Sequence, residues 1–361
     1  MSTLLSWHVS HRQDIGRVLS ATRNIKSWEL VIKDTALVVG PKVRPVCLGC
    51  LGDLQGDAHC PHCQWPLCSP DCQHHPHHQQ ECRIFQKSGF YPKTMNNGLY
   101  SCVSIIRVLL LKQNDKQGWT LIEKMMDHWE ERSSDQHVIS AIKVMTNLVI
   151  KHLGMSWITP SDVEHVYGVL KTNAVDINDG RGQALFPNSV CIMSHSCNAN
   201  LEPVSDPSQN ISFRAKRNIA EGEELTIRYT DFIDSKYNIR SQIVQEWKFS
   251  CLCQRCTDQT EFGTNISSLQ CSCGGFLYDT NPEYVEMDEE KLWKCSSCQR
   301  LENLSSRYKD ADQILKNLEG KTLEPQDMRN IQNNGEYHEN FYLLVKLRII
   351  FIEQNKNTKD R

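Results

Sequence analysis

The sequence predicts an α+β fold, because two strand-rich stretches flank one long helical stretch and cysteine-rich segments follow both strand-rich parts. Short apolar and β-branched runs broken by polar residues indicate small strands in 16–40 and again in 181–231. Apolar residues recur at helical spacing between 98 and 172. The cysteine-rich segments have little apolar content of their own, so bound metal would supply most of their folding free energy.

Further helices and strands are expected between residues 161 and 352. Segment 161–164, Ser-Asp-Val-Glu, resembles a capping box that opens a helix, and 243–249 is expected to form a short helix. From 302 the chain is helical and polar until the apolar segment 341–352, which needs a partner surface. Strands are expected at four runs, namely ALF (184–186), SVCIM (189–193), ISFRA (211–215) and EELTIRY (223–229).

Composition and charge exclude several classes of protein. The formal net charge of −3 gives no basic field over the whole molecule, so direct nucleic-acid binding is not expected to be its primary activity. No stretch approaches the roughly 20 apolar residues of a membrane span, and residues 1–20 hold no apolar run typical of a signal peptide. Seventeen cysteines in such a chain indicate metal binding in a reducing compartment. We expect the protein in the nucleus and cytoplasm, with no membrane partner.

The first cysteine-rich module has enough ligands for two zinc ions. Zinc takes four ligands at tetrahedral angles, and a C-x2-C pair supplies two of them from one turn. His78 and Cys82 are four residues apart, so one helical turn carries both on the same face. His74 and His77 are alternatives to His78. The expected pairing interleaves two sets: Cys47, Cys50, Cys68 and Cys72 against Cys60, Cys63, His78 and Cys82.

Two further zinc sites follow from the remaining cysteines. Cys251, Cys253 and Cys256 are three ligands, and Cys197 is the best candidate for the fourth. Another set is Cys271, Cys273, Cys295 and Cys298. Only Cys102 and Cys191 are left over, in apolar surroundings typical of core thiols. All four Zn²⁺ ions would then have four protein ligands, which indicates structural metals.

The spacing of the first module resembles the MYND zinc finger, including the Cys72-Gln73 step and the His-x3-Cys ending. The resemblance covers residues 46–83. MYND fingers bind partner proteins, so it implies docking of a proline-rich peptide or a corepressor.

Three other segments resemble the SET-domain lysine methyltransferases: Gly-Arg-Val-Leu at 16–19, Ser-His-Ser-Cys-Asn-Ala-Asn at 194–200 and Gly-Glu-Glu-Leu-Thr-Ile-Arg-Tyr at 222–229. A SET domain interrupted by a MYND finger and followed by cysteines is the arrangement of the SMYD family, here similar to its arthropod-type branch. The resemblance implies a SET β-fold split by the finger and a helical insertion. Its expected parts are SET N-terminal strands (1–45), MYND finger (46–83), helical insertion (84–180), SET catalytic core (181–250), post-SET region with an additional zinc site (251–300) and a short, truncated TPR-like helical region (301–361).

The same resemblance implies protein-lysine N-methyl transfer from S-adenosylmethionine to a histone or another protein, with a role in transcription regulation. Tyr229 matches the family's catalytic tyrosine, whose hydroxyl orients the amine and the methyl group. Cys197 would join the cofactor loop to the post-SET zinc. The residues expected to bind the cofactor are Gly16, Arg17, Asn173, Ser194, His195, Tyr229 and Phe249.

Several departures from the family pattern keep a second hypothesis open. Val18 replaces a glycine, Ser194 replaces an asparagine, Trp247 replaces a tyrosine, and Val175 replaces a phenylalanine. Each loss of a ligand hydrogen bond would weaken cofactor binding several-fold to about tenfold. The alternative is therefore a SET/MYND adaptor with weak or absent catalysis. A cross-brace ubiquitin ligase would explain the zinc topology but leaves the SET-like segments unexplained.

Overall fold

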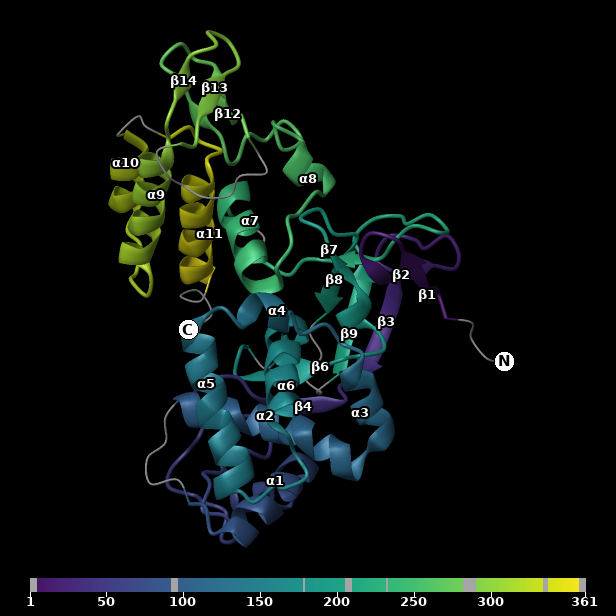
Figure 1. The fold of residues 1–361 in the computed structure, drawn as a ribbon. Coiled ribbons are helices and arrows are strands. Elements are labelled where there is room, and N and C mark those ends of the chain that lie inside the picture. The colour runs from purple at the N-terminus through teal and green to yellow at the C-terminus, as the bar shows by residue number, and fades with distance from the viewer. Residues whose placement is uncertain are drawn as a thin grey trace. The chain divides into compact units, whose positions relative to one another are not determined.

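A computed structural model describes this chain over residues 5–91, 97–177, 179–204, 210–231, 233–281, 290–333 and 337–356 (Figure 1). The chain forms two compact units. The first comprises Met1–Ser194 and Asn200–Thr226, and the second comprises His195–Ala199 and Ile227–Arg361. The α+β prediction is confirmed. The domain boundaries expected from the sequence stay predictions.

The first unit contains small antiparallel sheets. Strand β1 pairs with β2 as a hairpin, β3 and β8 flank β9, and β4 and β5 flank β6. The two three-stranded sheets each join segments far apart in sequence, so the stretch between these segments forms an insertion. The strands are β1 (Trp7–Arg12), β2 (Gly16–Ala21), β3 (Leu30–Thr35), β4 (Val38–Pro41), β5 (Val175–Ile177), β6 (Gly182–Leu185), β8 (Leu201–Val204) and β9 (Asn210–Ala215).

The insertion of the first unit is helical, and its longest helix packs on β4. The approach is close at Gly40, where an added Cβ would lie 2.2 Å from Ser104 Oγ, so the position requires glycine. The Ser104 hydroxyl donates to the Pro41 carbonyl at 2.7 Å and fixes this contact. The helical elements are η1 (Pro70–His74), α1 (Pro76–Ser88), α2 (Asn97–Asn114), α3 (Lys116–Glu123), α4 (Trp129–Arg132), α5 (Gln136–Thr146), the π-helix η2 (Asn147–His152), α6 (Pro160–Asn173) and η3 (Val190–Ile192).

Arg107, a buried residue of α2, joins three parts of the first unit. Its guanidinium donates to the carbonyl oxygens of Val39 in β4 (2.8 Å) and Leu48 (2.6 Å), and to Glu81 Oε1 in α1 (2.5 Å). Glu81 is completely buried. Burial by itself would raise the pKa of Glu81, but the positive charge of Arg107 and the contact with His78 lower it, so the carboxylate stays ionised.

The second unit is built on a four-stranded antiparallel ladder and a helical group. Trp293 is buried in this core, and its indole N–H donates to the Tyr237 hydroxyl at 2.7 Å. The apolar C-terminal segment finds its partner surface inside the unit, because Phe341, Tyr342 and Leu344 belong to the same buried cluster. The elements are α7 (Lys236–Trp247), α8 (Gln254–Thr257), β11 (Leu269–Gln270), β12 (Phe276–Asp279), β13 (Trp293–Cys295), β14 (Leu301–Glu302), α9 (Ser305–Leu318), α10 (Pro325–Asn333) and α11 (Tyr342–Lys356).

The chain passes between the units within two short strands that pair with each other, β7 (Ser194–His195) and β10 (Thr226–Ile227). Among the described residues, no helix combines the length and the apolar character that crossing a lipid bilayer requires.

Four local predictions differ from the structure. The helix expected at 243–249 is the end of the longer helix α7, and the strand expected at 223–229 is limited to the two residues of β10. The run 189–193 forms the 3₁₀ helix η3, because the Phe186 carbonyl accepts hydrogen bonds from the N–H groups of Ser189 (3.2 Å) and Cys191 (3.2 Å) and turns the chain. The helix expected to open at 161–164 begins at Pro160. Its capping box is formed by Thr159 and Asp162, because a proline at the first helical position favours the preceding residue as the cap.

We predict that Arg107→Met destabilises the protein by about 3–5 kcal/mol, because it leaves the buried Glu81 carboxylate without its cation. Lys112→Met is the matched control on the same helix. Lys112 pairs with Asp162 nearer the surface, where an ion pair contributes about 1 kcal/mol or less. Denaturant unfolding followed by circular dichroism measures both. Equal losses from the two substitutions would contradict the role given to Arg107.

Candidate zinc centres and active site

Four groups of cysteine and histidine side chains each bring their ligand atoms within 4.8 Å of one another. A zinc ion bound by sulfur at about 2.3 Å would hold neighbouring sulfurs about 3.8 Å apart. Seven sulfur pairs within these groups lie 3.4 to 4.0 Å apart, so the groups fit tetrahedral zinc. The prediction of four zinc-binding clusters is confirmed, with these members: Cys47, Cys50, Cys68, Cys72; Cys60, Cys63, His78, Cys82; Cys197, Cys251, Cys253, Cys256; and Cys271, Cys273, Cys295, Cys298.

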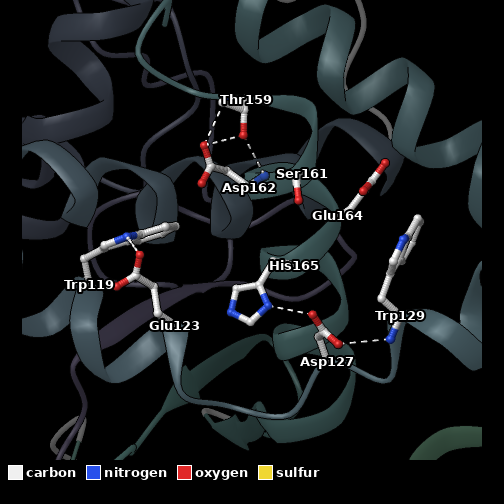
Figure 2. A pocket seen from close by; sticks show the side chains of 9 residues that line it. All are labelled: Trp119, Glu123, Asp127, Trp129, Thr159, Ser161, Asp162, Glu164 and His165. Atoms are coloured by element: carbon white, nitrogen blue, oxygen red, sulfur yellow. Dashed lines mark hydrogen bonds and ion pairs between the residues drawn. The ribbon is translucent and has the colours of Figure 1, made fainter.

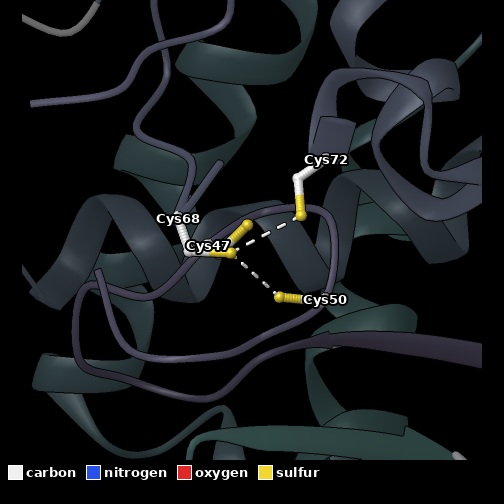
Figure 3. A group of neighbouring side chains, drawn as sticks. All are labelled: Cys47, Cys50, Cys68 and Cys72. Atoms are coloured by element: carbon white, nitrogen blue, oxygen red, sulfur yellow. Dashed lines mark hydrogen bonds between the residues drawn. The ribbon is translucent and has the colours of Figure 1, made fainter. Parts of the chain in front are cut away.

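The first cluster joins Cys47 and Cys50 of one loop to Cys68 and to Cys72, which lies in η1 (Figure 3). Cys68 Sγ lies 3.4 Å from Cys50 Sγ and 3.5 Å from Cys72 Sγ. The backbone N–H of Gly52 donates to Cys50 Sγ, and the Ser69 hydroxyl donates to Cys72 Sγ. Such donors stabilise thiolates, the form in which cysteine binds a metal.

The second cluster is fully buried and carries its own supporting carboxylate. Helix α1 supplies His78 and Cys82 on one face, and the sulfur of Cys63 lies 3.5 Å from His78 Nε2. The other ring nitrogen, Nδ1, faces Glu81 Oε1 at 3.4 Å. This leaves Nε2 for the metal and fixes the ring orientation. The structure therefore brings His78, and neither His74 nor His77, into this cluster.

Sequence reasoning did not find Glu81 or Arg107, although both support the second cluster. Glu81 stands directly before a ligand and three residues after another, so it shares their helix face. That spacing is the one local signal that could have identified it.

The third cluster lies in the second unit and is linked to Tyr229 through His195. His195 Nδ1 accepts the Tyr229 backbone N–H at 3.0 Å, which leaves the proton on Nε2. Nε2 lies 3.2 Å from Cys197 Sγ and donates to it. Arg228 also donates to the Cys197 carbonyl at 2.9 Å. The imidazole thus connects a predicted zinc ligand to the backbone of the predicted catalytic tyrosine.

Tyr229 lies within a group of aromatic rings in the second unit. Its ring centroid is 5.3 Å from that of His195 and 5.2 Å from that of Trp247. Phe249 lies 6.4 Å from His195 and is 37% exposed. Aromatic faces of this kind attract the methylenes and the cationic end of a lysine side chain.

The other predicted cofactor residues belong to the first unit, and each has a defined environment there. Gly16 opens β2 with φ +81°, and nothing lies within 4 Å of the position a Cβ would take. Arg17 is exposed, and its guanidinium donates to the Lys124 carbonyl at 3.3 Å. Ser194 is half-buried in β7. The roles predicted for these residues stay predictions.

Asn173 is the predicted cofactor residue whose contacts differ most from that role. It ends α6, and its side-chain amide donates to the carbonyls of Met126 (2.8 Å) and Val169 (3.0 Å). One bond joins α6 to the loop between α3 and α4, and the other lies within α6, so both amide hydrogens are already donated.

The two remaining cysteines, Cys102 and Cys191, lie outside the four clusters. Burial raises the pKa of the Cys102 thiol to about 11 and that of Cys191 to about 12.

A separate open pocket of about 310 Å³ lies in the helical insertion (Figure 2). His165 points into it, with Nδ1 2.6 Å from Asp127 Oδ2 and Nε2 3.0 Å from the Ile122 carbonyl. The Trp119 indole donates to Glu123 at 2.7 Å. These side chains satisfy one another. No predicted site residue lines this pocket.

The family model described as "SET domain" matches residues 16–230, more than half of the chain. The chain belongs to the SET domain family. The expected SET fold is thereby confirmed. The match ends one residue after Tyr229, so it includes the whole Gly222–Tyr229 segment.

Curated relatives of this SET chain include proteins of the SMYD group, one of them from an arthropod. "SET domain-containing protein SmydA-8, isoform A" of Drosophila melanogaster is 27% identical over 82% of this chain and 65% of that protein. "Histone-lysine N-methyltransferase SMYD1" of Homo sapiens is 24% identical over 67% and 54%. "SET domain and MYND-type zinc finger protein 6" of Schizosaccharomyces pombe is 26% identical over 67% and 50%. The chain thus spans between half and two thirds of these relatives.

Among solved structures, "Structure of Rubisco LSMT bound to AdoMet" aligns over 97% of this chain and 85% of that chain, with a TM-score of 0.44 and 10% identity. Because this TM-score is low, the family assignment rests on the match to the SET domain family model.

We predict that the four zinc ions leave in an order set by the exposure of their ligands. Cys273 and Cys298 are exposed, so the fourth cluster should lose its metal first, and the fully buried second cluster should lose it last. A chromogenic chelator should therefore report separate phases of zinc release. Cys273→Ser should remove the fastest phase and Cys82→Ser the slowest. A single phase, or a fast phase retained by Cys273→Ser, would contradict this order.

Proposed function

We propose that this SET chain is a protein-lysine N-methyltransferase that uses S-adenosylmethionine. The observation that carries the proposal is the placement of Tyr229 among His195 and Trp247, with its backbone held through His195 to the third zinc cluster. The names of matched relatives, such as histone-lysine N-methyltransferase, support the same reaction class. The substrate would be a lysine of a histone or another protein.

Methyl transfer requires a neutral lysine amine in line with the reactive methyl carbon. S-adenosylmethionine supplies an electrophilic methyl group when bound. The chain's part is to orient the amine, and the Tyr229 hydroxyl is the group proposed to do so. Trp247 and Tyr229 would confine the lysine methylenes, which limits the positions open to the amine.

The first unit offers features that fit the cofactor's methionine part. The open space at Gly16 allows close approach to the backbone, and Arg17 carries a positive charge suited to a carboxylate. We propose that both residues bind that end of the cofactor, with Ser194 and His195 near its adenosine and Phe249 against the adenine ring.

A second candidate function is a SET/MYND adaptor with little or no catalysis. The observation that favours it is Asn173, whose amide hydrogens are already donated to Met126 and Val169. Val18, which is buried in β2, and Ser194 also favour the adaptor, because both depart from the family's cofactor-binding pattern. Calorimetry with S-adenosylmethionine separates the two hypotheses, because an idle SET core would show no heat of binding at millimolar cofactor.

We also propose partner docking by the finger, residues 46–83. Its tryptophan, Trp65, is buried against Phe85 and Tyr100. A proline-rich peptide binds exposed aromatic rings, so it would need an aromatic residue outside the finger, such as Tyr91, which follows α1 and is 48% exposed. Nuclear and cytoplasmic localisation, and a role in transcription, remain part of the proposal.

We predict that Tyr229→Phe abolishes methyl transfer, since it removes the hydroxyl that orients the amine and leaves the ring contacts in place. The loss should be at least about 100-fold, as for other single catalytic donors. Transfer of labelled methyl to a histone mixture measures activity, and calorimetry should show that the variant still binds the cofactor. Full activity in the variant would exclude Tyr229 as the catalytic residue.

We predict that two substitutions at His195 separate its two hydrogen bonds. In His195→Asn, the side-chain oxygen can still accept the Tyr229 N–H, whereas in His195→Gln the amide can still donate to Cys197. The Gln variant should lose several-fold to about tenfold in kcat, with its zinc content unchanged. The Asn variant should keep more of kcat and release the third zinc faster. Identical behaviour of the two variants would show that His195 acts only by filling space.

A further inference from the structure

Trp28 has a backbone conformation that tryptophan rarely adopts. It is the third residue of a tight turn closed by the Glu29 N–H donating to the Lys26 carbonyl at 3.1 Å. Its φ is +68°, in the left-handed region that this turn position requires and that normally selects glycine. A bulky side chain here costs conformational free energy, which must be offset by something the indole does.

Burial in the core does not offset that cost, because Trp28 is 64% exposed. In its hydrogen bonds with the described residues, Trp28 contributes to the turn only backbone groups, which any residue other than proline would supply. The Trp28 N–H donates to the Ala215 carbonyl at 2.7 Å, and its carbonyl accepts from Arg214 Nη1 at 2.8 Å. The fold therefore specifies the path of the chain at this turn and leaves the indole directed to the surface.

The surroundings of Trp28 combine an apolar residue with positive charge. Leu30, 45% exposed, lies opposite Arg214 in the β3–β9 pairing and extends the apolar surface. Glu29 is held in an ion pair by Arg23. The charged residues nearby are Arg23, Lys26, Arg214 and Lys216 against Glu29 and Glu202, a surplus of two positive charges.

We propose that Trp28 anchors an acidic segment of a partner protein, with Leu30 beside it and Lys26 and Arg214 pairing with carboxylates. Tryptophan and arginine are among the residues enriched in binding hot spots. A surplus of two charges on a chain of net charge −3 is too small for nucleic-acid binding, which depends on many phosphate contacts. This surface does not depend on the proposed methyl transfer.

The test uses the full chain and a short fluorescein-labelled peptide of repeating Glu-Glu-Leu, followed by fluorescence anisotropy. Trp28→Gly should weaken binding at least about tenfold, and its melting temperature should be equal or higher, because glycine suits the left-handed turn. Lys26→Glu should also weaken binding. Phe262→Gly is the matched control, since Phe262 is another exposed aromatic residue with positive φ (+62°, 53% exposed) in the second unit. It should leave binding unchanged.

Three results would overturn the proposal. One is a Trp28→Gly protein that melts at a lower temperature, which would give the indole a role in the fold. Another is peptide binding that is absent, or equal in Trp28→Gly and the unaltered chain. The last is tighter binding of labelled single-stranded DNA, or of a Lys-Lys-Leu peptide, than of the acidic peptide.

Discussion

The buried ion pair between Arg107 and Glu81 determines how the first zinc-rich segment joins the rest of its unit. One guanidinium reaches a strand carbonyl of β4, a loop carbonyl of the finger and the carboxylate of α1. The same carboxylate faces the imidazole of His78. The finger is thus attached to the sheet through charge and hydrogen bonds, and its metal, its helix and α2 depend on a single set of donors and acceptors.

A similar arrangement recurs at the third cluster, with histidine as the connecting group. His195 faces the sulfur of Cys197 on one side and the backbone of Tyr229 on the other. A metal with four protein ligands cannot bind substrate directly. It can still affect the reaction proposed for this chain, because the position of Tyr229 depends on a ring whose tautomer the cluster helps to set.

The parts of this site that the sequence predicted are those with a local signature. Pairs such as C-x2-C lie within one turn, so spacing alone assigned their metals, and counting the remaining ligands identified Cys197. Arg107 and Glu81 are 26 residues apart and carry no such signature. Their pairing follows from how α1 and α2 pack, which spacing does not encode. The amide contacts of Asn173 depend on a neighbouring loop in the same way.

The short excursion His195–Ala199 has a consequence for how the protein is made. This stretch belongs to the second unit although first-unit sequence lies on both sides of it. Cys197 is therefore synthesised before the other three ligands of its cluster. Cys251, Cys253 and Cys256 follow it by more than fifty residues. Zinc capture by this cluster closes a long loop, and it can occur only after most of the SET region has left the ribosome. Zinc would then bind at this cluster after all of the first unit, which ends at Thr226, has been synthesised.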